Sequence, residues 1–238
     1  MIAEGFCANG ANVVIASRKL SICAQVASEI NSKYPQGFCS AFQADVSLET
    51  DIDALAAFLQ TKFSHLDVLI NNAGKTWGAP FKSFPKKAWD SILAVNITAP
   101  FILTQKLVPL LSVNASQGSP AHIINIGSVV GLRPVANDAY SYGTSKAAIH
   151  HLTQMLANEL APYNITVNAI APGPFPSRMM AHATEDGETK DELIATTPLK
   201  RLGRAEDICG AALYLSSSAG AFVTGAILSV DGGIAVAV

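Results

Sequence analysis

The sequence predicts an α/β protein built on a doubly wound parallel sheet. Two observations support this prediction. Short runs rich in Val, Ile, Leu and Ala alternate with longer segments of helical period along the 238 residues. Most of these short runs are nearly continuous in apolar residues, which is typical of strands covered on both faces. No internal repeat, low-complexity tract or linker interrupts the alternation, so we expect one domain over residues 1–238.

The expected elements follow in order along the chain. Strands are expected at residues 12–16, 38–44, 67–71, 122–126, 166–170 and 226–230. Helices are expected at residues 19–33, 48–63, 86–111, 141–160 and 205–216, and residues 1–10 are interpreted as a helix already under way. Repeated strand-then-helix units with right-handed crossovers give a Rossmann-type three-layer α/β/α arrangement. The Gly- and Pro-bearing residues 172–203 are expected to be irregular, with a substrate lid at about 174–203.

Composition excludes some classes of partner. The 16 basic and 18 acidic residues give a net charge of −2, which offers no electrostatic support for binding nucleic acid or an anionic membrane. No uninterrupted apolar run approaches the 18 or more residues of a membrane span. The 50% hydrophobic content therefore indicates a large core, an oligomer interface, or both. We expect no nucleic-acid partner and no membrane.

No metal site is expected either. The cysteines show no metal-ligand spacing and are interpreted as reduced, packed thiols of an intracellular protein: Cys7, Cys23, Cys39 and Cys209. His150 and His151 are adjacent on one expected helix, without a carboxylate or third histidine at ligand spacing. We interpret them as one core or interface side chain and one solvated side chain.

Tyr142 and Lys146 carry the strongest chemical signal. They lie four residues apart near the start of an expected helix, which places both on one face, about 6 Å apart along the axis. A lysine ammonium near a phenol lowers the phenol pKa from about 10 and favours proton exchange near neutrality. The Ser128 hydroxyl, at the end of an expected strand, is suited to polarise a carbonyl oxygen. Tyr140 has Thr144 four residues on and is interpreted as a wall of the substrate pocket.

The residues after the first expected strand indicate a cofactor preference. In dinucleotide folds, an acidic residue there binds the adenosine ribose, whereas arginine accommodates a 2′-phosphate. Here Ser17 and Arg18 occupy this place, followed by Lys19, with no carboxylate. Since a guanidinium suits bidentate phosphate contact, we predict NADP(H). The alternative is that Arg18 and Lys19 only begin a solvated helix.

Six sequence pieces occur in the order and spacing of the short-chain dehydrogenase/reductase family, which the chain resembles over essentially its whole length. They are Asn71-Asn72-Ala73-Gly74, Asn96, Asn125-Ile126-Gly127-Ser128, Tyr142-x-x-x-Lys146, Pro172-Gly173 and Asp231-Gly232-Gly233. The resemblance implies hydride transfer between a nicotinamide and a carbonyl carbon. Tyr142 would be the general acid/base, and Ser128 would bind the substrate oxygen. Lys146 would hold the nicotinamide ribose, and Asn96 would anchor a water.

The same resemblance implies further cofactor contacts and an assembly. Asp45 and Val46 would contact the adenine, and the adenosine side would rest on Asn72, Ala73 and Gly74, with Pro172 and Gly173 also at the cofactor. The expected helices at 86–111 and 141–160 are apolar around much of their circumference. In this family such helices would form the interface of a homodimer or homotetramer. A cytoplasmic location is expected.

The segment at residues 171–177 looks most like the 3-oxoacyl reductases of rhamnolipid synthesis, and somewhat less like the general 3-oxoacyl-[acyl-carrier-protein] reductases. This resemblance implies reduction of a 3-oxoacyl thioester to its 3-hydroxyacyl form. Met179 and Met180 would offer an adaptable apolar surface to an acyl chain, or would simply pack beneath the lid. The cations Lys200, Arg201 and Arg204 would meet an acidic acyl carrier protein, or would form a solvated face. The alternatives are a sugar or polyol dehydrogenase of the same family and a non-catalytic NADP-binding protein.

One family feature is absent from the sequence. The glycine-rich turn T-G-x-x-x-G-x-G should close a first strand and open the first helix, but the sequence begins inside that helix. Gly5 and Gly10 do not replace the turn, because no strand precedes them and no helix N-terminus follows to face a pyrophosphate. We therefore expect a fold lacking its first strand, with about twenty residues missing before Met1. A chain that truly began there would bind NADP(H) poorly and expose two sheet edges.

Overall fold

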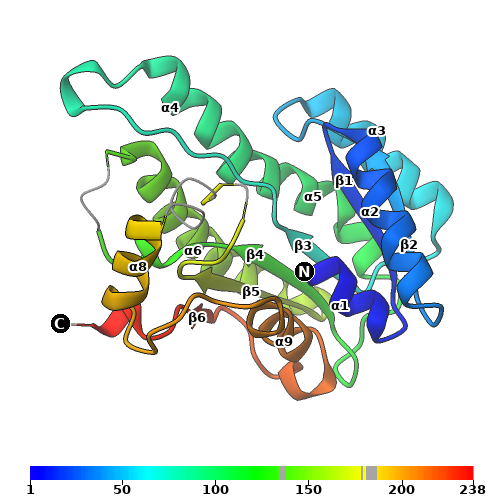
Figure 1. Ribbon diagram of the computed structural model, residues 1–238. Coiled ribbons are helices and arrows are strands. Elements are labelled where there is room, and N and C mark those ends of the chain that lie inside the picture. The colour runs from blue at the N-terminus through cyan, green and yellow to red at the C-terminus, as the bar shows by residue number, and fades with distance from the viewer. Residues whose placement is uncertain (135–137, 178, 181–186, 238) are drawn as a thin grey trace.

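Parallel strands lie between helices in the structure, a computed structural model that describes residues 1–134, 138–177, 179–180 and 187–237 (Figure 1). The strands of this described part are β1 (Asn12–Ser17), β2 (Phe38–Gln43), β3 (Val68–Asn71), β4 (Ala121–Ile126), β5 (Ile165–Pro172) and β6 (Ile227–Val230). Every pairing between these strands is parallel. The predicted α/β class with a parallel sheet is confirmed.

The strands form two ladders. In one ladder β1 pairs with β2, from Asn12 opposite Phe38 to Ser17 opposite Gln43. In the other ladder the order is β3-β4-β5-β6. Because parallel strands end at the same edge, the residues that follow β3, β4 and β5 come together at one side of the larger ladder.

The helices are α1 (Ile2–Ala8), α2 (Leu20–Lys33), α3 (Glu49–Lys62), α4 (Lys86–Leu93), α5 (Ala99–Leu111), α6 (Tyr140–Leu160), α8 (Gly187–Thr196) and α9 (Ala205–Leu215). The stretch expected to be helical at 86–111 is helical, with a π-helical turn, η2 (Ala94–Thr98), between α4 and α5. Pro100 has no N–H to donate to the carbonyl of Asn96, which favours a widened turn there.

The stretch expected to be irregular, residues 172–203, contains helix α8. None of the residues of α8 is buried, so its sequence carries no apolar periodicity that would predict a helix. The lid expected at about 174–203 falls partly on residues 178 and 181–186, which lie outside the described residues.

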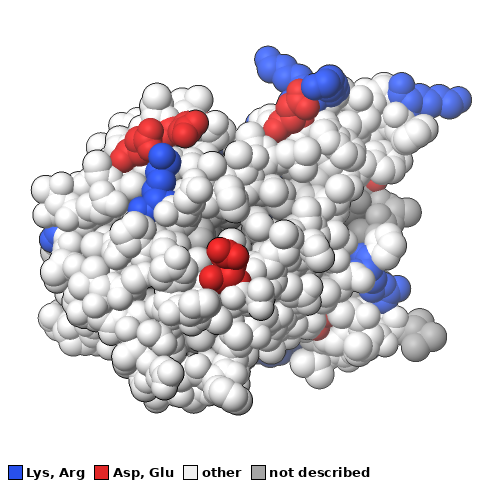
Figure 2. All heavy atoms as spheres, turned by 180° about the vertical axis from the view of Figure 1, so that it is seen from behind, with Lys and Arg blue, Asp and Glu red and all other residues white. Residues whose placement is uncertain are grey.

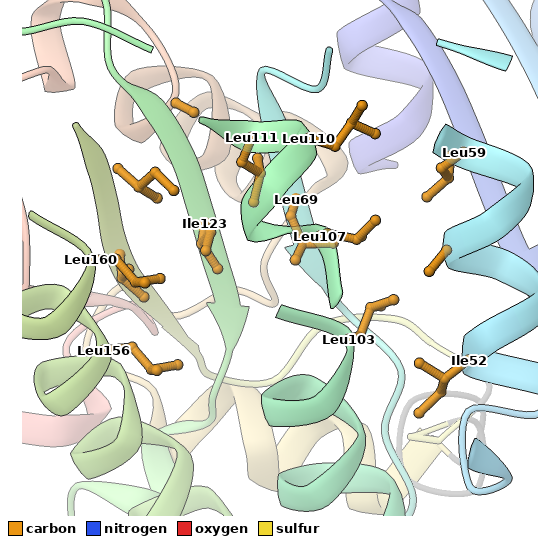
Figure 3. Packing of buried hydrophobic residues seen from close by; sticks show 14 of the residues in the cluster. Ile52, Leu59, Leu69, Leu103, Leu107, Leu110, Leu111, Ile123, Leu156 and Leu160 are labelled. Carbon is orange, nitrogen blue, oxygen red and sulfur yellow. The ribbon is translucent and has the colours of Figure 1, made fainter. Parts of the chain in front are cut away.

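The main core lies between the larger ladder and helices α3, α5 and α6 (Figure 3). Leu107 and Leu111 of α5 and Ile123 of β4 are almost completely buried there. Each such side chain contributes about 1.5–3 kcal/mol through burial. The stretch Lys86–Leu111 is long and apolar enough to cross a membrane by length and composition alone. In this fold its second half supplies the core, which explains its apolar character.

Helix α9 packs on the opposite side of the sheet. Ile208 and Leu215 of α9 join Ile124 of β4 and Ile170 of β5 in a second buried cluster. Seen from behind, the surface is mostly uncharged, and the Lys and Arg side chains lie in separate groups rather than on one basic face (Figure 2). That distribution agrees with the net charge of −2.

Candidate active site

Hydrogen-bonded asparagines fix the ends of β3 and β4. Asn71 and Asn125 lie opposite each other in register, and Asn71 Nδ2 donates to Asn125 Oδ1 at 2.8 Å. Asn125 Nδ2 in turn donates to Thr153 Oγ1 of α6 at 2.9 Å. All three side chains are buried, so these bonds hold α6 at a defined position against the carboxyl ends of the strands.

Ser128 stands directly beyond this edge and is held by its backbone. Its N–H donates to Nε2 of His150 on α6 at 3.4 Å, and its hydroxyl accepts a bond from the N–H of Val130 at 3.4 Å. The preceding residue, Gly127, donates to the Ile170 carbonyl at 2.7 Å. The His150 imidazole fills the space beside Gly127, where a Cβ atom would lie only 2.0 Å from Nε2.

Tyr142 and Lys146 project from one face of α6 towards Ser128. Lys146 Nζ lies 5.6 Å from the centroid of the Tyr142 ring and donates to the Ile126 carbonyl at 2.6 Å. The Ser128 side chain lies near the Tyr142 phenol, where it acts to lower the phenol pKa. The structure thus brings together the serine, the tyrosine and the lysine that the sequence placed in one site.

The electrostatics of this group differ from the sequence prediction. Burial raises the pKa of Tyr142 above its usual value, and the nearby Ser128 side chain opposes this shift only in part. Burial also lowers the pKa of Lys146 to about 8. The predicted lowering of the Tyr142 pKa by Lys146 is wrong here, because loss of solvent dominates both groups. The Lys146 ammonium is directed to the Ile126 carbonyl and lies beside the phenol ring.

Asn96 sits in the π-helical turn η2 and is buried. Its Oδ1 accepts a bond from the N–H of Lys75 at 2.9 Å. Its Nδ2 donates to the Lys75 carbonyl at 3.0 Å and to Ser145 Oγ at 2.9 Å. Both N–H groups of the side-chain amide are therefore used within the protein. The role expected for Asn96 as a water anchor stays a prediction.

The adenosine-side candidates gather at the ends of β1 and β2. Ser17 ends β1, and Arg18 follows it, with its carbonyl bonded to Gln43 Nε2 at 3.2 Å. Asp45 accepts bonds from the Ser47 N–H and hydroxyl at 3.0 and 2.6 Å, and these bonds lower the Asp45 pKa. The charges of Arg18 and Lys75 lower it further. Val46 follows Asp45 and is half-buried.

The other cofactor candidates lie beyond β3 and β5. Asn72, Ala73 and Gly74 are exposed after β3, and a Cβ on Gly74 would lie 3.9 Å from Lys146 Nζ. Pro172 ends β5, and Gly173 donates to the Val230 carbonyl at 3.0 Å. A Cβ on Gly173 would meet the backbone of Asp231 at 2.7 Å, so only glycine fits there.

Sequence reasoning missed several residues at the site. Phe81 and Phe84 pack edge-on against Tyr140, the first residue of α6, with 5.8 and 5.7 Å between their ring centroids and that of Tyr140. Two aromatic residues three positions apart in the sequence are the signal that indicates this packing. Ser145 and Lys75, which bond Asn96, were missed because the sequence gives no sign of the contact. His150 is buried and His151 exposed, as interpreted from the sequence.

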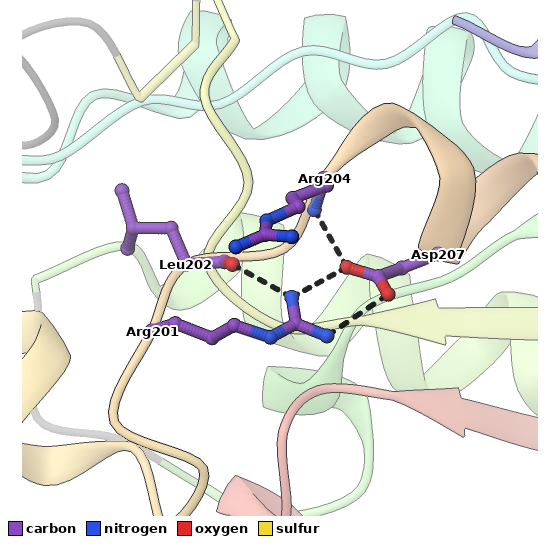
Figure 4. Close-up of polar contacts among 4 residues, drawn as sticks. All are labelled: Arg201, Leu202, Arg204 and Asp207. Atoms are coloured by element: carbon purple, nitrogen blue, oxygen red, sulfur yellow. Dashed lines mark hydrogen bonds and ion pairs between the residues drawn. The ribbon is translucent and has the colours of Figure 1, made fainter.

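Among the basic residues after α8, the side chain of Arg201 is bonded within the protein. Arg201 makes a bidentate pair with Asp207 at 2.6 and 3.0 Å and also donates to the Leu202 carbonyl (Figure 4). The Arg204 N–H donates to the same carboxylate at 2.7 Å. These bonds lower the Asp207 pKa to about 2. Arg201 therefore fixes the start of α9, a role that explains its charge without any partner.

The fold and these side chains define a class of protein: a Rossmann-type α/β oxidoreductase with a Ser–Tyr–Lys group at the carboxyl ends of its strands. The family described as "Enoyl-(Acyl carrier protein) reductase" matches residues 1–235. The chain belongs to the short-chain dehydrogenase/reductase family of oxidoreductases.

Relatives in this family cover nearly the whole chain. It is 42% identical over 233 residues to the rhamnolipids biosynthesis 3-oxoacyl-[acyl-carrier-protein] reductase of Pseudomonas aeruginosa, covering 98% of this chain and 90% of that protein. It is 33% identical to the 5-keto-D-gluconate 5-reductase of Escherichia coli, covering 100% and 91%. The Pseudomonas aeruginosa RhlG/NADP active-site complex matches with a TM-score of 0.95 and 42% identity, over 99% of this chain and 91% of that one.

Proposed function

We propose that this protein is an NADP(H)-dependent reductase that converts a 3-oxoacyl thioester into a 3-hydroxyacyl thioester. The observation that carries the proposal is that Ser128, Tyr142 and Lys146 come together beyond β4, with Lys146 Nζ beside the phenol ring. The 42%-identical relative named as a 3-oxoacyl-[acyl-carrier-protein] reductase supports the substrate class. The similar structure of an NADP complex supports the cofactor.

The residues present fit NADP(H) at both of its ends. Arg18 has no carboxylate beside it in sequence, so Ser17 and Arg18 would hold the 2′-phosphate, with Asp45 and Val46 at the adenine. The exposed backbone of Asn72, Ala73 and Gly74 leaves room for close approach, since Gly74 lacks a side chain next to Lys146. Tyr142 and Lys146 would hold the nicotinamide ribose, and Pro172 and Gly173 would complete the site.

Residues of this chain would supply the proton that the reduction needs. When bound, NADPH supplies the hydride. Ser128 would donate a hydrogen bond to the substrate oxygen and polarise the carbonyl. As the carbon accepts hydride, the carbonyl electron pair moves to oxygen, and that oxygen takes the Tyr142 proton. The raised pKa of Tyr142 keeps the phenol protonated at neutral pH, as an acid must be. Lys146, with a pKa of about 8, is suited to return a proton to Tyr142 after that transfer.

Residues around the site support the parts of the proposal that concern the lid and the assembly. The lid would include Phe175, which is buried, and Met179, whose Cε lies 3.8 Å from where a Gly74 Cβ would be. We place the protein in the cytoplasm as one domain. Phe101 on α5 and Met155 on α6 are exposed apolar side chains, and they support a homodimer or homotetramer through these helices. The substrate would arrive as a small molecule or on an acyl carrier protein.

A sugar or polyol substrate is the second candidate, because the 33%-identical relative is named as a 5-keto-D-gluconate 5-reductase. The deciding experiment measures NADPH oxidation by the purified protein with acetoacetyl thioester and with a panel of keto-sugars. Turnover of the thioester at the higher kcat/KM supports the proposal. Turnover of a keto-sugar alone replaces the substrate class, and NADPH binding with no carbonyl turnover favours the non-catalytic alternative.

A further inference from the structure

Ser145 lies directly before Lys146 in α6, has 0% exposure, and belongs to no role described so far. Its hydroxyl donates to the Tyr142 carbonyl at 2.7 Å. It also accepts a bond from Asn96 Nδ2 at 2.9 Å. A single buried hydroxyl therefore joins the first turn of α6 to the π-helical turn that holds Asn96.

The direction of each bond in this network is determined by the backbone. The Lys75 N–H can only donate, so the Asn96 atom facing it is the oxygen, and the amide nitrogen faces Ser145. The Tyr142 carbonyl can only accept, so the one Ser145 proton points to it. Ser145 must then accept from Asn96. Four bonds thus run without conflict from the backbone of Lys75 through Asn96 and Ser145 to that of Tyr142.

The first turn of α6 carries the candidate acid. Tyr142 lies in this turn, and helix ends fray more readily than helix interiors. Asn96 is itself anchored by two bonds to the Lys75 backbone, at 2.9 and 3.0 Å. The bond through Ser145 thus connects the first turn of α6, through Asn96, to the backbone of Lys75 beyond β3.

We propose that Ser145 is a positioning residue: its hydroxyl couples Asn96 to the first turn of α6 and thereby holds the Tyr142 phenol against Ser128. This inference rests on the proposed carbonyl reduction. The hydrogen bonds of the Ser145 hydroxyl within the described residues go to Asn96 and to the Tyr142 carbonyl, so we assign it a positioning role and not a catalytic one. Its loss would leave an Asn96 N–H unpaired and release the turn that carries the acid.

The chain offers a matched control one helical turn away. Ser141 also has 0% exposure and lies in the same helix. Within the described part of the chain, its Oγ has no hydrogen-bond partner. Ser141→Ala and Ser145→Ala therefore remove the same atom from equally buried sites, and only the second removes a link to Asn96.

The experiment measures kcat and KM for acetoacetyl thioester, NADPH affinity by fluorescence, and the unfolding temperature, for wild type and both variants. We expect Ser145→Ala to lower kcat at least tenfold, with KM and NADPH affinity within about twofold, because a small displacement of a catalytic group slows the chemical step. Ser141→Ala should retain wild-type kcat. Asn96→Ala combined with Ser145→Ala should be no slower than the slower single variant, because both act through one link.

Equal kcat values for Ser145→Ala and Ser141→Ala, at a temperature where both are folded, would overturn the proposal. So would fully additive losses in the Asn96→Ala, Ser145→Ala pair. If wild type reduces a keto-sugar and not the thioester, the proposed substrate fails, and the Ser145 effect is measured on that ketone. A wild-type protein without carbonyl turnover overturns both proposals.

Discussion

At the scale of the residue, burial decides the charge states of the site. Lys146 and Tyr142 are near neighbours, yet their pKa values move apart: that of Lys146 falls to about 8, and that of Tyr142 rises. Each shift favours the neutral form, which is the signature of desolvation rather than of attraction between opposite charges. The pair is therefore suited to donate a proton to a substrate oxygen near neutral pH.

Lys146→Met should raise the free energy of unfolding while abolishing activity. The folded-state pKa of about 8 lies below the ordinary 10.5, so the buried ammonium destabilises the fold fully below pH 8 and less as the pH rises towards 10.5. We expect the variant to gain about 2 kcal/mol in free energy of unfolding at pH 7, after allowing for the lost bond to Ile126, and clearly less at pH 10. Turnover should be lost.

Urea unfolding at the two pH values measures this gain, with Lys87→Met on the exposed side of α4 as the control. A Lys146→Met protein that is less stable than wild type at pH 7 would contradict the account of the buried ammonium.

Arg18→Asp tests the cofactor preference at a single side chain. A carboxylate here repels a 2′-phosphate and suits the ribose hydroxyls of NADH. We expect the KM for NADPH to rise at least tenfold and the KM for NADH to fall, because a bidentate contact to phosphate is lost. Steady-state kinetics with both cofactors measure this, with Lys19→Asp as the neighbouring control. An unchanged KM for NADPH would remove Arg18 from the site.

At the scale of the element, the contact between β4 and α6 sets the position of Ser128. The His150 imidazole needs the empty space at Gly127, since a Cβ there would lie 2.0 Å from Nε2 and 2.6 Å from Cδ2. The ring in turn accepts the Ser128 N–H. The glycine and the histidine therefore form one packing unit between strand and helix.

Gly127→Ala should lower the free energy of unfolding by about 1–3 kcal/mol, because the added methyl overpacks this contact. His150→Ala removes the ring, so the double variant should lose less than the sum of the two single losses. Chemical denaturation of the three variants measures the coupling. Additive losses would show that the two positions do not share the space.

Most elements could be predicted from the sequence, for identifiable reasons. The strands and α2, α3, α6 and α9 are long or strongly apolar, and their bounds fall within about two residues of expectation. The helix α8 could not be predicted, because none of its side chains is buried. The π-helical turn at Ala94–Thr98 follows from Pro100, whose missing N–H favours a widened turn.

At the scale of the whole molecule, the fold assembles a site from residues far apart in the chain. Asn71 bonds Asn125, and Ser128 lies near Tyr142, because parallel strands end at one edge and α6 crosses it. That Ser128 and Tyr142 share one site could be predicted from the order of strands and motifs. The direction of the Tyr142 pKa shift could not be predicted, because it depends on how much solvent the folded protein removes from the phenol. The link through Ser145 depends on tertiary contacts in the same way.

The most direct measurement is NADPH oxidation by Tyr142→Phe with acetoacetyl thioester as substrate, alongside NADPH binding by the same variant. The account predicts that kcat falls by about 10²–10⁴-fold, because the phenol proton is lost, while NADPH affinity stays near wild type. Turnover within a few-fold of wild type would contradict the assignment of Tyr142 as the proton donor, and with it the proposed mechanism.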